Sequence, residues 1–64
     1  MTLKIGDVVG GSRIAPTDVH DGRWWIRPDS GTSVVVIDMQ ADGAIPQARL
    51  PSRDAAERWC DERE

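Results

Sequence analysis

Residues 23–50 contain three β-type runs separated by two turn signals, and this stretch restricts the chain to a fold built on an antiparallel sheet. The runs are RWWIR, SVVVIDM and IPQARL, and the turn signals are PDSGT and QADGA. The middle run is dense in β-branched residues, which favours a strand over a helix. Both of its alternating sets are apolar near its start, as in a central strand that is covered on both faces. The stretch therefore predicts a three-stranded meander.

The second turn signal predicts how the middle and last runs pair. Asp42-Gly43 suits a hairpin turn because both residues tolerate positive φ. A four-residue loop centred there pairs Val35 with Leu50 and makes one side of the hairpin wholly apolar, so burial also specifies the register. Pro46 has no N–H to donate, which predicts that the last run is an edge strand or carries a bulge.

The first turn signal, at residues 28–31, predicts that Trp24 lies opposite Val35 and that Trp25 lies opposite Val34. Trp24 then faces the core on one side of the sheet, and Trp25 lies on the other side. We call this other side the predicted Arg/Trp face. Its candidate partner-binding residues are Arg23, Trp25, Arg27, Val34, Val36, Ile45 and Arg49.

Residues 1–15 are predicted to form two short strands. The first, TLKIGDVV, bends or bulges at Gly6, and residues 12–15 form a short return strand. Residues 16–22 are polar and rich in turn formers, so they predict a loop in which Val19 points inward.

A helix is predicted at residues 52–62. Ser52 is a suitable N-cap because its hydroxyl accepts a hydrogen bond from the first turn, and Pro51 marks the boundary. The helix has one apolar stripe, which consists of Ala55, Ala56, Trp59 and Cys60. Trp59 is expected to pack on the core face of the sheet beside Trp24.

Residues 1–64 are expected to form a single α+β domain that is mainly β. The architecture is a small antiparallel sheet of four or five strands, twisted or partly closed, with one C-terminal helix. A chain of 64 residues buries only about 60% of its unfolded surface, so its stability is marginal. One cysteine excludes an internal disulfide framework. Oligomerisation is the remaining common way for so short a chain to gain stability, and we expect a homodimer.

No residue pattern predicts a catalytic centre, a metal site or a cofactor. His20 is close in sequence to Asp18 and Asp21, but a loop histidine beside aspartates is typical of a solvated surface. Ser12, His20 and Asp21 have the residue types of a nucleophilic triad, but nothing in the sequence fixes their geometry. Cys60 is expected to be a small buried hydrophobe.

The chain is acidic, with a net charge of −3, and its acidic residues gather in the turns and in the C-terminal DERE. This charge argues against a general DNA coat, which would be basic. The single thiol fits a reducing cytoplasm. No apolar run approaches the length of a membrane span, and no signal peptide or lipidation motif is recognised. We therefore expect a cytoplasmic location and no membrane partner.

The predicted Arg/Trp face has the strongest functional potential. An exposed aromatic side chain flanked by guanidinium groups can bind an anchor residue of a protein, or stack a base while the arginines hold phosphate. Alternatively, residues 1–15 or a twofold partner cover this face. We expect a non-enzymatic protein-binding module, with nucleic-acid binding through the same face as the alternative. A structural or assembly subunit is the third hypothesis.

Two family resemblances can be drawn from these residues. KIGDVV, followed by a Gly-rich turn and VVVIDMQADG, resembles the layout of small SH3-like barrels. RWWIR, VVVID, ARL and SRDAAERW resemble the β-β-β-α arm-type domains at the start of phage integrases. In those domains a strand-borne Trp and a helix with spaced Ala and Trp pack the core. Ala55 and Trp59 match this helix pattern, and the resemblance implies that Arg23, Arg27 and Arg49 face DNA.

The chain also has the general look of a small bacteriophage or mobile-element accessory protein. Such proteins typically bind and modulate a host protein, so this likeness implies a host protein as the partner.

Overall fold

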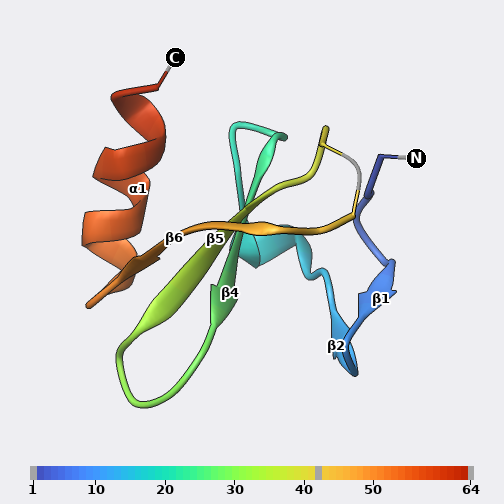
Figure 1. Cartoon of the computed structure of the whole chain (residues 1–64), viewed down its shortest axis with the longest axis horizontal. Coiled ribbons are helices and arrows are strands. Elements are labelled where there is room, and N and C mark those ends of the chain that lie inside the picture. The colour runs from blue at the N-terminus through green and yellow to red at the C-terminus, as the bar shows by residue number, and fades with distance from the viewer. Residues whose placement is uncertain (1, 42, 64) are drawn as a thin grey trace.

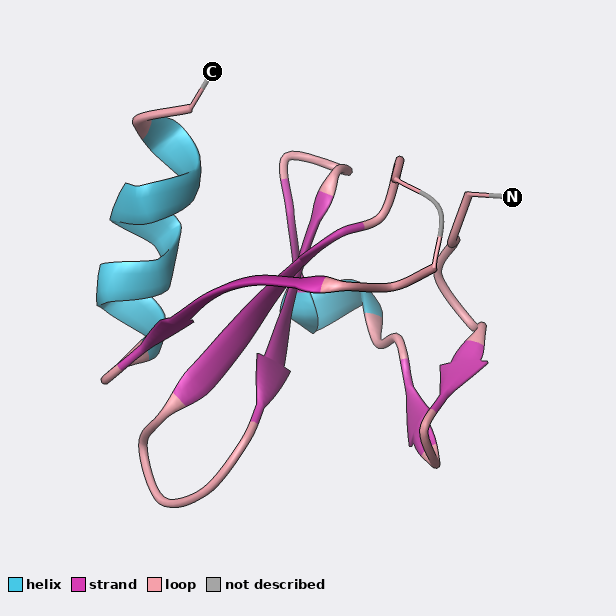
Figure 2. Cartoon of the chain, in the orientation of Figure 1, coloured by secondary structure: helices cyan, strands magenta, loops and turns pink. Residues whose placement is uncertain are grey.

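The computed structural model describes residues 2–41 and 43–63, and its centre is a four-stranded antiparallel sheet (Figures 1 and 2). In the order β3-β4-β5-β6, the sheet consists of β3 (Val19–His20), β4 (Trp24–Pro28), β5 (Val34–Asp38) and β6 (Pro46–Leu50). The remaining elements are the hairpin of β1 (Val8–Val9) and β2 (Ser12–Arg13), the 3₁₀ turn η1 (Pro16–Asp18) and the helix α1 (Arg53–Asp61).

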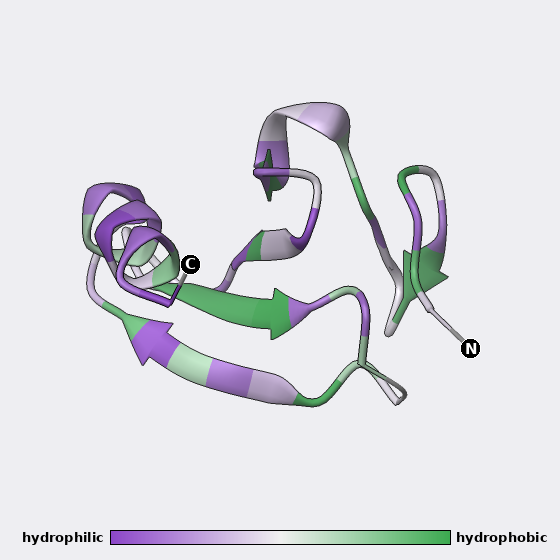
Figure 3. Ribbon diagram, turned by 90° about the horizontal axis from the view of Figure 1, so that it is seen from above, coloured by the Kyte–Doolittle hydropathy of each residue, from purple (hydrophilic) through white to green (hydrophobic). Residues whose placement is uncertain are grey.

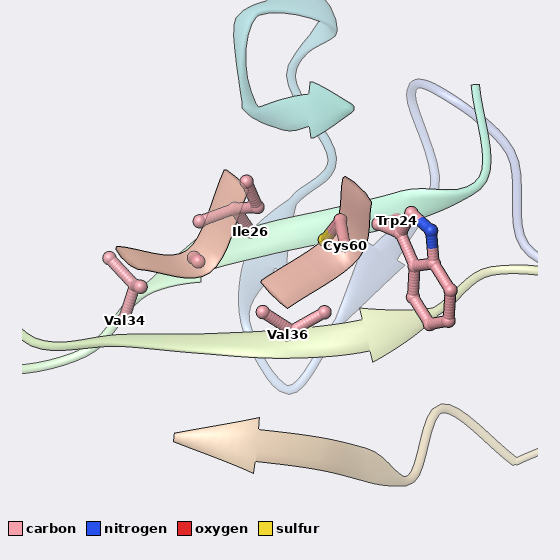
Figure 4. Close-up of a cluster of buried hydrophobic side chains, with 6 residues drawn as sticks. Trp24, Ile26, Val34, Val36 and Cys60 are labelled. Carbon is pink, nitrogen blue, oxygen red and sulfur yellow. The ribbon is translucent and has the colours of Figure 1, made fainter. Parts of the chain in front are cut away.

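The two faces of the sheet carry separate hydrophobic clusters. The helix-side cluster consists of Trp24, Ile26, Val34, Val36, Ala56 and Cys60, with Leu50 and Trp59 packed against it (Figure 4). The hairpin-side cluster consists of Ile14, Trp25, Ile37 and Met39, with Leu3, Val9, Val19, Val35 and Ala44 packed against it. Successive side chains of a strand point to opposite faces, which is why the adjacent Trp24 and Trp25 belong to different clusters. Because β5 supplies both clusters, its predicted burial on both faces is confirmed.

The helix forms as its sequence predicts. The Ser52 hydroxyl accepts a hydrogen bond from the Ala55 N–H at 3.2 Å, which caps the first turn. One face of α1 buries Cys60 in the helix-side cluster. The rings of Trp24 and Trp59 meet edge to face, with centroids 5.3 Å apart and planes at 84°. The expected contact between these two tryptophans is therefore confirmed.

The N-terminal segment covers the side of the sheet on which Trp25 lies. Ile14 is completely buried there, and its N–H donates to the Asp7 C=O at 2.9 Å. The Leu3 N–H donates to the Met39 C=O at 2.8 Å, which ties the segment to the end of β5. The bend at Gly6 is confirmed by its φ of 98°. The predicted eight-residue first strand is wrong, since only β1 pairs in that region.

The pairing of β4 with β5 differs from the prediction. Trp25 pairs with Ile37 and not with Val34. The predicted turn is too tight, because the loop extends to Ser33, whose C=O accepts from the Asp29 N–H at 3.0 Å. The longer loop shifts the whole hairpin and changes which residues face one another across the sheet.

The pairing of β5 with β6 is also shifted, by one residue. Val35 pairs with Arg49 and not with Leu50, so the predicted register is wrong. Since β5 is apolar on both faces, either register buries apolar side chains, and the burial pattern alone does not choose between them. The predicted turn at Asp42-Gly43 includes Asp42, which lies outside the described residues.

β6 is an edge strand and carries a bulge, as its proline predicts. It is the last strand in the sheet order. Val36 pairs with Ala48 and Ile37 pairs with Pro46, so Gln47 is an extra residue in β6.

Residues 16–22, predicted to be a loop, contain η1 and the edge strand β3. Val19 pairs with Trp25 and packs on the hairpin-side cluster, so its inward orientation is confirmed. The overall prediction of a mainly β α+β fold, with an antiparallel sheet and one C-terminal helix, is also confirmed. Across the described residues the sheet keeps two separate edges, β3 and β6, and does not close into a barrel.

Candidate partner-binding surface

The structure does not bring the residues of the predicted Arg/Trp face together. Trp25 is 1% exposed in the hairpin-side cluster, whereas Val34 and Val36 are buried in the helix-side cluster. The prediction that these residues share one exposed face is therefore wrong, and its cause is the shifted pairing of β4 and β5. All three side chains pack in the interior of the fold.

Arg23 lies at the end of the sheet where β4 begins and β5 ends, and its contacts stabilise that end. It donates to Asp38 from Nη2 to Oδ2 at 3.1 Å and from Nε to Oδ1 at 3.4 Å. Its guanidinium carbon lies 4.6 Å from the ring centroid of Trp24. The hydrogen bond from Arg23 lowers the pKa of the Asp38 carboxyl below its ordinary value, with help from the Gln40 N–H and against the effect of burial. Arg23 thus joins the start of β4 to the end of β5.

Arg27, Val35 and Arg49 form one cross-strand row on the hairpin side of the sheet. Arg27 pairs with Val35, and Val35 pairs with Arg49. The Arg27 guanidinium carbon lies 5.9 Å from the ring centroid of Trp25, and Arg49 forms an ion pair with Asp29. Among residues 2–41 and 43–63, no carboxylate lies within ion-pairing distance of Arg27.

Beside this row, β6 forms an open edge of the sheet. Figure 3 shows the strand at the outer border of the molecule, with hydrophilic and apolar residues alternating along it. An antiparallel edge strand leaves about half of its backbone N–H and C=O groups without a strand partner. A shallow hollow of about 300 Å³ adjoins this edge, and its lining consists of Val35, Pro46, Gln47, Ala48 and Arg49.

Ile45 extends the apolar part of this region beyond the hollow. It directly precedes β6, and 62% of its surface is exposed. We use the name β6 surface for Ile45, the hollow, and the row of Arg27, Val35 and Arg49. Three residues of the predicted Arg/Trp face, Arg27, Ile45 and Arg49, thus remain on one surface. Val35 and Ala48, which line the hollow, were predicted to lie in the core, although Pro46 already indicated an exposed edge.

The lining of the hollow is mainly uncharged. The lining of the hollow has one charged side chain, that of Arg49, and contains no carboxylate, imidazole or thiol. General acid–base and nucleophilic catalysis both need such groups within reach of one another.

A second polar cluster lies where β3 meets the end of α1. His20 Nε2 donates to Asp61 Oδ1 at 2.8 Å and lies 3.4 Å from Asp21 Oδ2. The hydrogen bond to Asp61 raises the pKa of His20, partly opposed by burial and supported by the negative charges of Asp21, Asp61 and Glu57. The structure therefore joins His20 to Asp21 and to a residue 41 positions away. Asp18 instead forms an ion pair with the first residue of α1.

The other candidate groups are not assembled into a site. Ser12 lies in β2, and in the described part of the chain no hydrogen bond joins it to His20. Cys60 is fully buried, as expected for a small hydrophobe.

No protein-family model matches this chain, and no curated protein or solved structure matches it significantly. The resemblances to SH3-like barrels and to arm-type domains therefore rest only on the residues that suggested them. In the part of the chain that the structure describes, no helix combines the length and the apolar character needed to cross a membrane.

Proposed function

We propose that this chain is a non-enzymatic protein-binding module that holds an extended segment of a partner protein along the edge of β6. The observation that carries the proposal is the open edge strand beside a hollow of about 300 Å³. An extended segment that joins a sheet edge gains main-chain hydrogen bonds, and pockets along that edge select its alternate side chains.

The second half of β6 is better suited to this role than the first. Pro46 has no N–H, and the bulge at Gln47 interrupts the strand ladder. Both features are devices by which natural edge strands avoid unwanted pairing. Residues 48–50 follow without either feature, so we assign the partner segment to that part of the edge.

The charges around the hollow indicate the kind of segment that binds. Arg27 has no ion-pairing carboxylate among the described residues, and the Arg49 side chain is 70% exposed although it contacts Asp29. Val35, Pro46 and Ala48 are the apolar residues in the lining of the hollow. A segment that carries one acidic and one apolar side chain on the same face matches this combination.

The remaining expectations about partner and location are also proposals. The general look of a phage accessory protein favours a host protein as the partner. The single, buried cysteine, Cys60, favours action in a reducing cytoplasm. Nucleic acid remains the alternative partner for Arg27 and Arg49. However, non-specific single-strand binding relies on aromatic side chains that stack on bases, and Trp25 is too buried to do so.

The test is affinity capture from nuclease-treated lysate with wild type, an Ile45→Ser/Arg49→Ala double variant, and Val8→Ser. Val8 and Ile45 are both 62% exposed, so Val8→Ser removes an equally exposed apolar side chain from a different element. Circular dichroism establishes that each variant is folded. We expect a stoichiometric protein that wild type and Val8→Ser retain and the double variant loses.

Hydrogen exchange on the captured complex then examines the mode of binding. The amides of residues 48–50 should become protected when the partner segment joins the edge. Retention of the partner by the double variant, or protection confined to other elements, would contradict the proposal. Recovery of this chain alone would favour an assembly subunit. Recovery of nucleic acid without nuclease, with affinity that falls steeply as salt rises, would favour the alternative.

A further inference from the structure

We propose that His20, Asp21 and Asp61 form a binding site for a divalent transition-metal ion of the Zn²⁺ class, where the β3–β4 turn meets the C-terminal end of α1. This site lies on elements that the β6 surface does not use, and it stands independently of the proposed function. Its donors are one imidazole and two carboxylates, a set suited to Zn²⁺ and similar ions.

The donor atoms are spaced as such an ion requires. His20 Nε2 lies 2.8 Å from Asp61 Oδ1 and 3.4 Å from Asp21 Oδ2, and the three donors all lie within 4.8 Å of one another. Zinc–ligand bonds of about 2.0–2.2 Å separate two donors by about 3.0 Å at a right angle and about 3.4 Å at the tetrahedral angle. The exposed Asp61 side chain can close the remaining distance by rotation.

A hydrogen bond alone does not account for the second carboxylate. Nε2 carries a single hydrogen atom, which it donates to Asp61. Asp21 nevertheless approaches the same nitrogen to 3.4 Å. A metal ion in place of that hydrogen would contact all three donors at once, and the proton of the neutral ring would then be on Nδ1. The side chains are 22%, 45% and 64% exposed for His20, Asp21 and Asp61, so water can complete the coordination.

The electrostatic field at the cluster also favours a cation. Asp61 is the last residue of α1, at the end where the helix dipole is negative. Glu57 adds negative charge from the preceding turn, although Arg53 lies 3.2 Å from it and compensates part of that charge. In the described ion pairs of Asp21 and Asp61, the partner is the His20 ring, which is positive only when it is protonated. A divalent ion would supply the missing positive charge.

Metal binding would join two distant parts of the chain. His20 and Asp61 are 41 residues apart, so the donors converge only in the folded state. An ion that binds only the folded state raises its stability by mass action. Bound Zn²⁺ would therefore hold α1, which covers the helix-side cluster, against the edge strand β3.

The experiment is a Zn²⁺ titration of untagged, chelator-treated protein, followed by NMR and by calorimetry. His20 is the only histidine in the chain, so its imidazole signals report on this site alone. Metal affinity depends on pH, because the ring nitrogen must lose its proton to coordinate, so every titration is made at the same pH of about 7.5. We expect a saturable shift of the His20 signals, one ion bound per chain, and a higher unfolding temperature with Zn²⁺ present.

Three variants make the test specific. His20→Gln and Asp61→Asn should each weaken Zn²⁺ binding by at least tenfold, since loss of even a ligand's hydrogen-bond partner costs about 10–100-fold in affinity. Asp54→Asn removes an exposed carboxylate from the first turn of the same helix and should bind Zn²⁺ like wild type. The proposal is overturned if the His20 signals of the folded protein show no saturable shift, or if His20→Gln binds Zn²⁺ as tightly as wild type.

Discussion

Trp24 and Trp25 are adjacent in sequence but anchor opposite sides of the same sheet. Trp24 is 4% exposed in the helix-side cluster, and Trp25 is 1% exposed in the hairpin-side cluster. The chain has no Phe or Tyr, and among the described residues these two rings are the largest buried side chains. β4 thus contributes one tryptophan to each of two small cores, and the stability of each core depends on that residue.

Trp25→Ala should abolish the folded state. Truncation of a buried Trp to Ala costs about 3–5 kcal/mol. A single core in a chain shorter than about 70–80 residues rarely supplies more than about 3–5 kcal/mol in total. The loss is therefore comparable to the whole free energy of unfolding. Circular dichroism of the variant should lack the cooperative thermal transition of wild type.

Two variants separate this effect from a general sensitivity to mutation. Trp25→Phe keeps most of the ring and removes an indole N–H that has no acceptor within the described residues, so it should retain a cooperative transition. Ile45→Ala changes an exposed side chain and should alter stability by no more than about 0.5 kcal/mol. A folded Trp25→Ala protein would mean that the hairpin-side cluster contributes little to stability.

Ser52→Ala should lower the stability of the protein without unfolding it. The Ser52 hydroxyl accepts the Ala55 N–H at 3.2 Å, and loss of such an N-cap costs about 1 kcal/mol. In a domain of this size that corresponds to a decrease of about 4–8 °C in Tm. Ser52→Asp preserves a capping oxygen and should keep the Tm near that of wild type. An equal decrease for both variants would argue against the cap.

The helix, the central strand and the edge strand could be predicted because each depends on local signals. These signals are the Ser52 cap, the β-branched residues of β5 and the missing N–H of Pro46. Register is not a local property. β5 is apolar on both faces, so burial tolerates a pairing of Val35 with either Arg49 or Leu50. The pairing of β4 with β5 is shifted as well, with Trp25 opposite Ile37 and not Val34, and this shift is the reason that buried residues were placed on a predicted binding face. The contact of His20 with Asp61 spans 41 residues and has no local signal at all.

The missed strand β3 leads to a prediction about its turn. Asp21 and Gly22 connect β3 to β4 with φ values of 56° and 69°, and the Arg23 N–H donates to the His20 C=O at 3.2 Å. This is an Asp-Gly turn of the type that the sequence analysis recognised only at residues 42–43. The sequence did not indicate this turn, because the two residues of β3 are too few to show a strand pattern before it.

Gly22→Ala should destabilise the protein by about 1 kcal/mol, the cost of a left-handed backbone for a residue with a Cβ. No heavy atom lies within 4 Å of the position that this Cβ would occupy, so the cost comes from the backbone alone. Gly22→Asn should cost less, because Asn tolerates this conformation. Urea unfolding of the two variants measures the difference, and equal stability of Gly22→Ala and wild type would contradict the positive φ.

The ion pair between Arg23 and Asp38 should make stability depend on pH in the acidic range. The hydrogen bond from Arg23 lowers the pKa of Asp38 in the folded state relative to about 3.9 in an unfolded chain. Above the unfolded pKa the carboxylate is charged in both states, and the contribution of the pair is fully present. As the pH falls from there through the lower folded pKa, the folded protein takes up a proton and that contribution is lost.

Asp38→Asn tests this relation directly. At neutral pH the variant should be less stable than wild type, since it removes the charge that Arg23 contacts at 3.1 Å. As the pH falls below about 4, the protonated Asp38 of wild type comes to resemble the amide, and the difference in free energy of unfolding should shrink. Urea unfolding of both proteins across this range provides the comparison. A difference that stays constant down to low pH would mean that Asp38 stabilises the fold through its shape or its other hydrogen bonds and not through its charge.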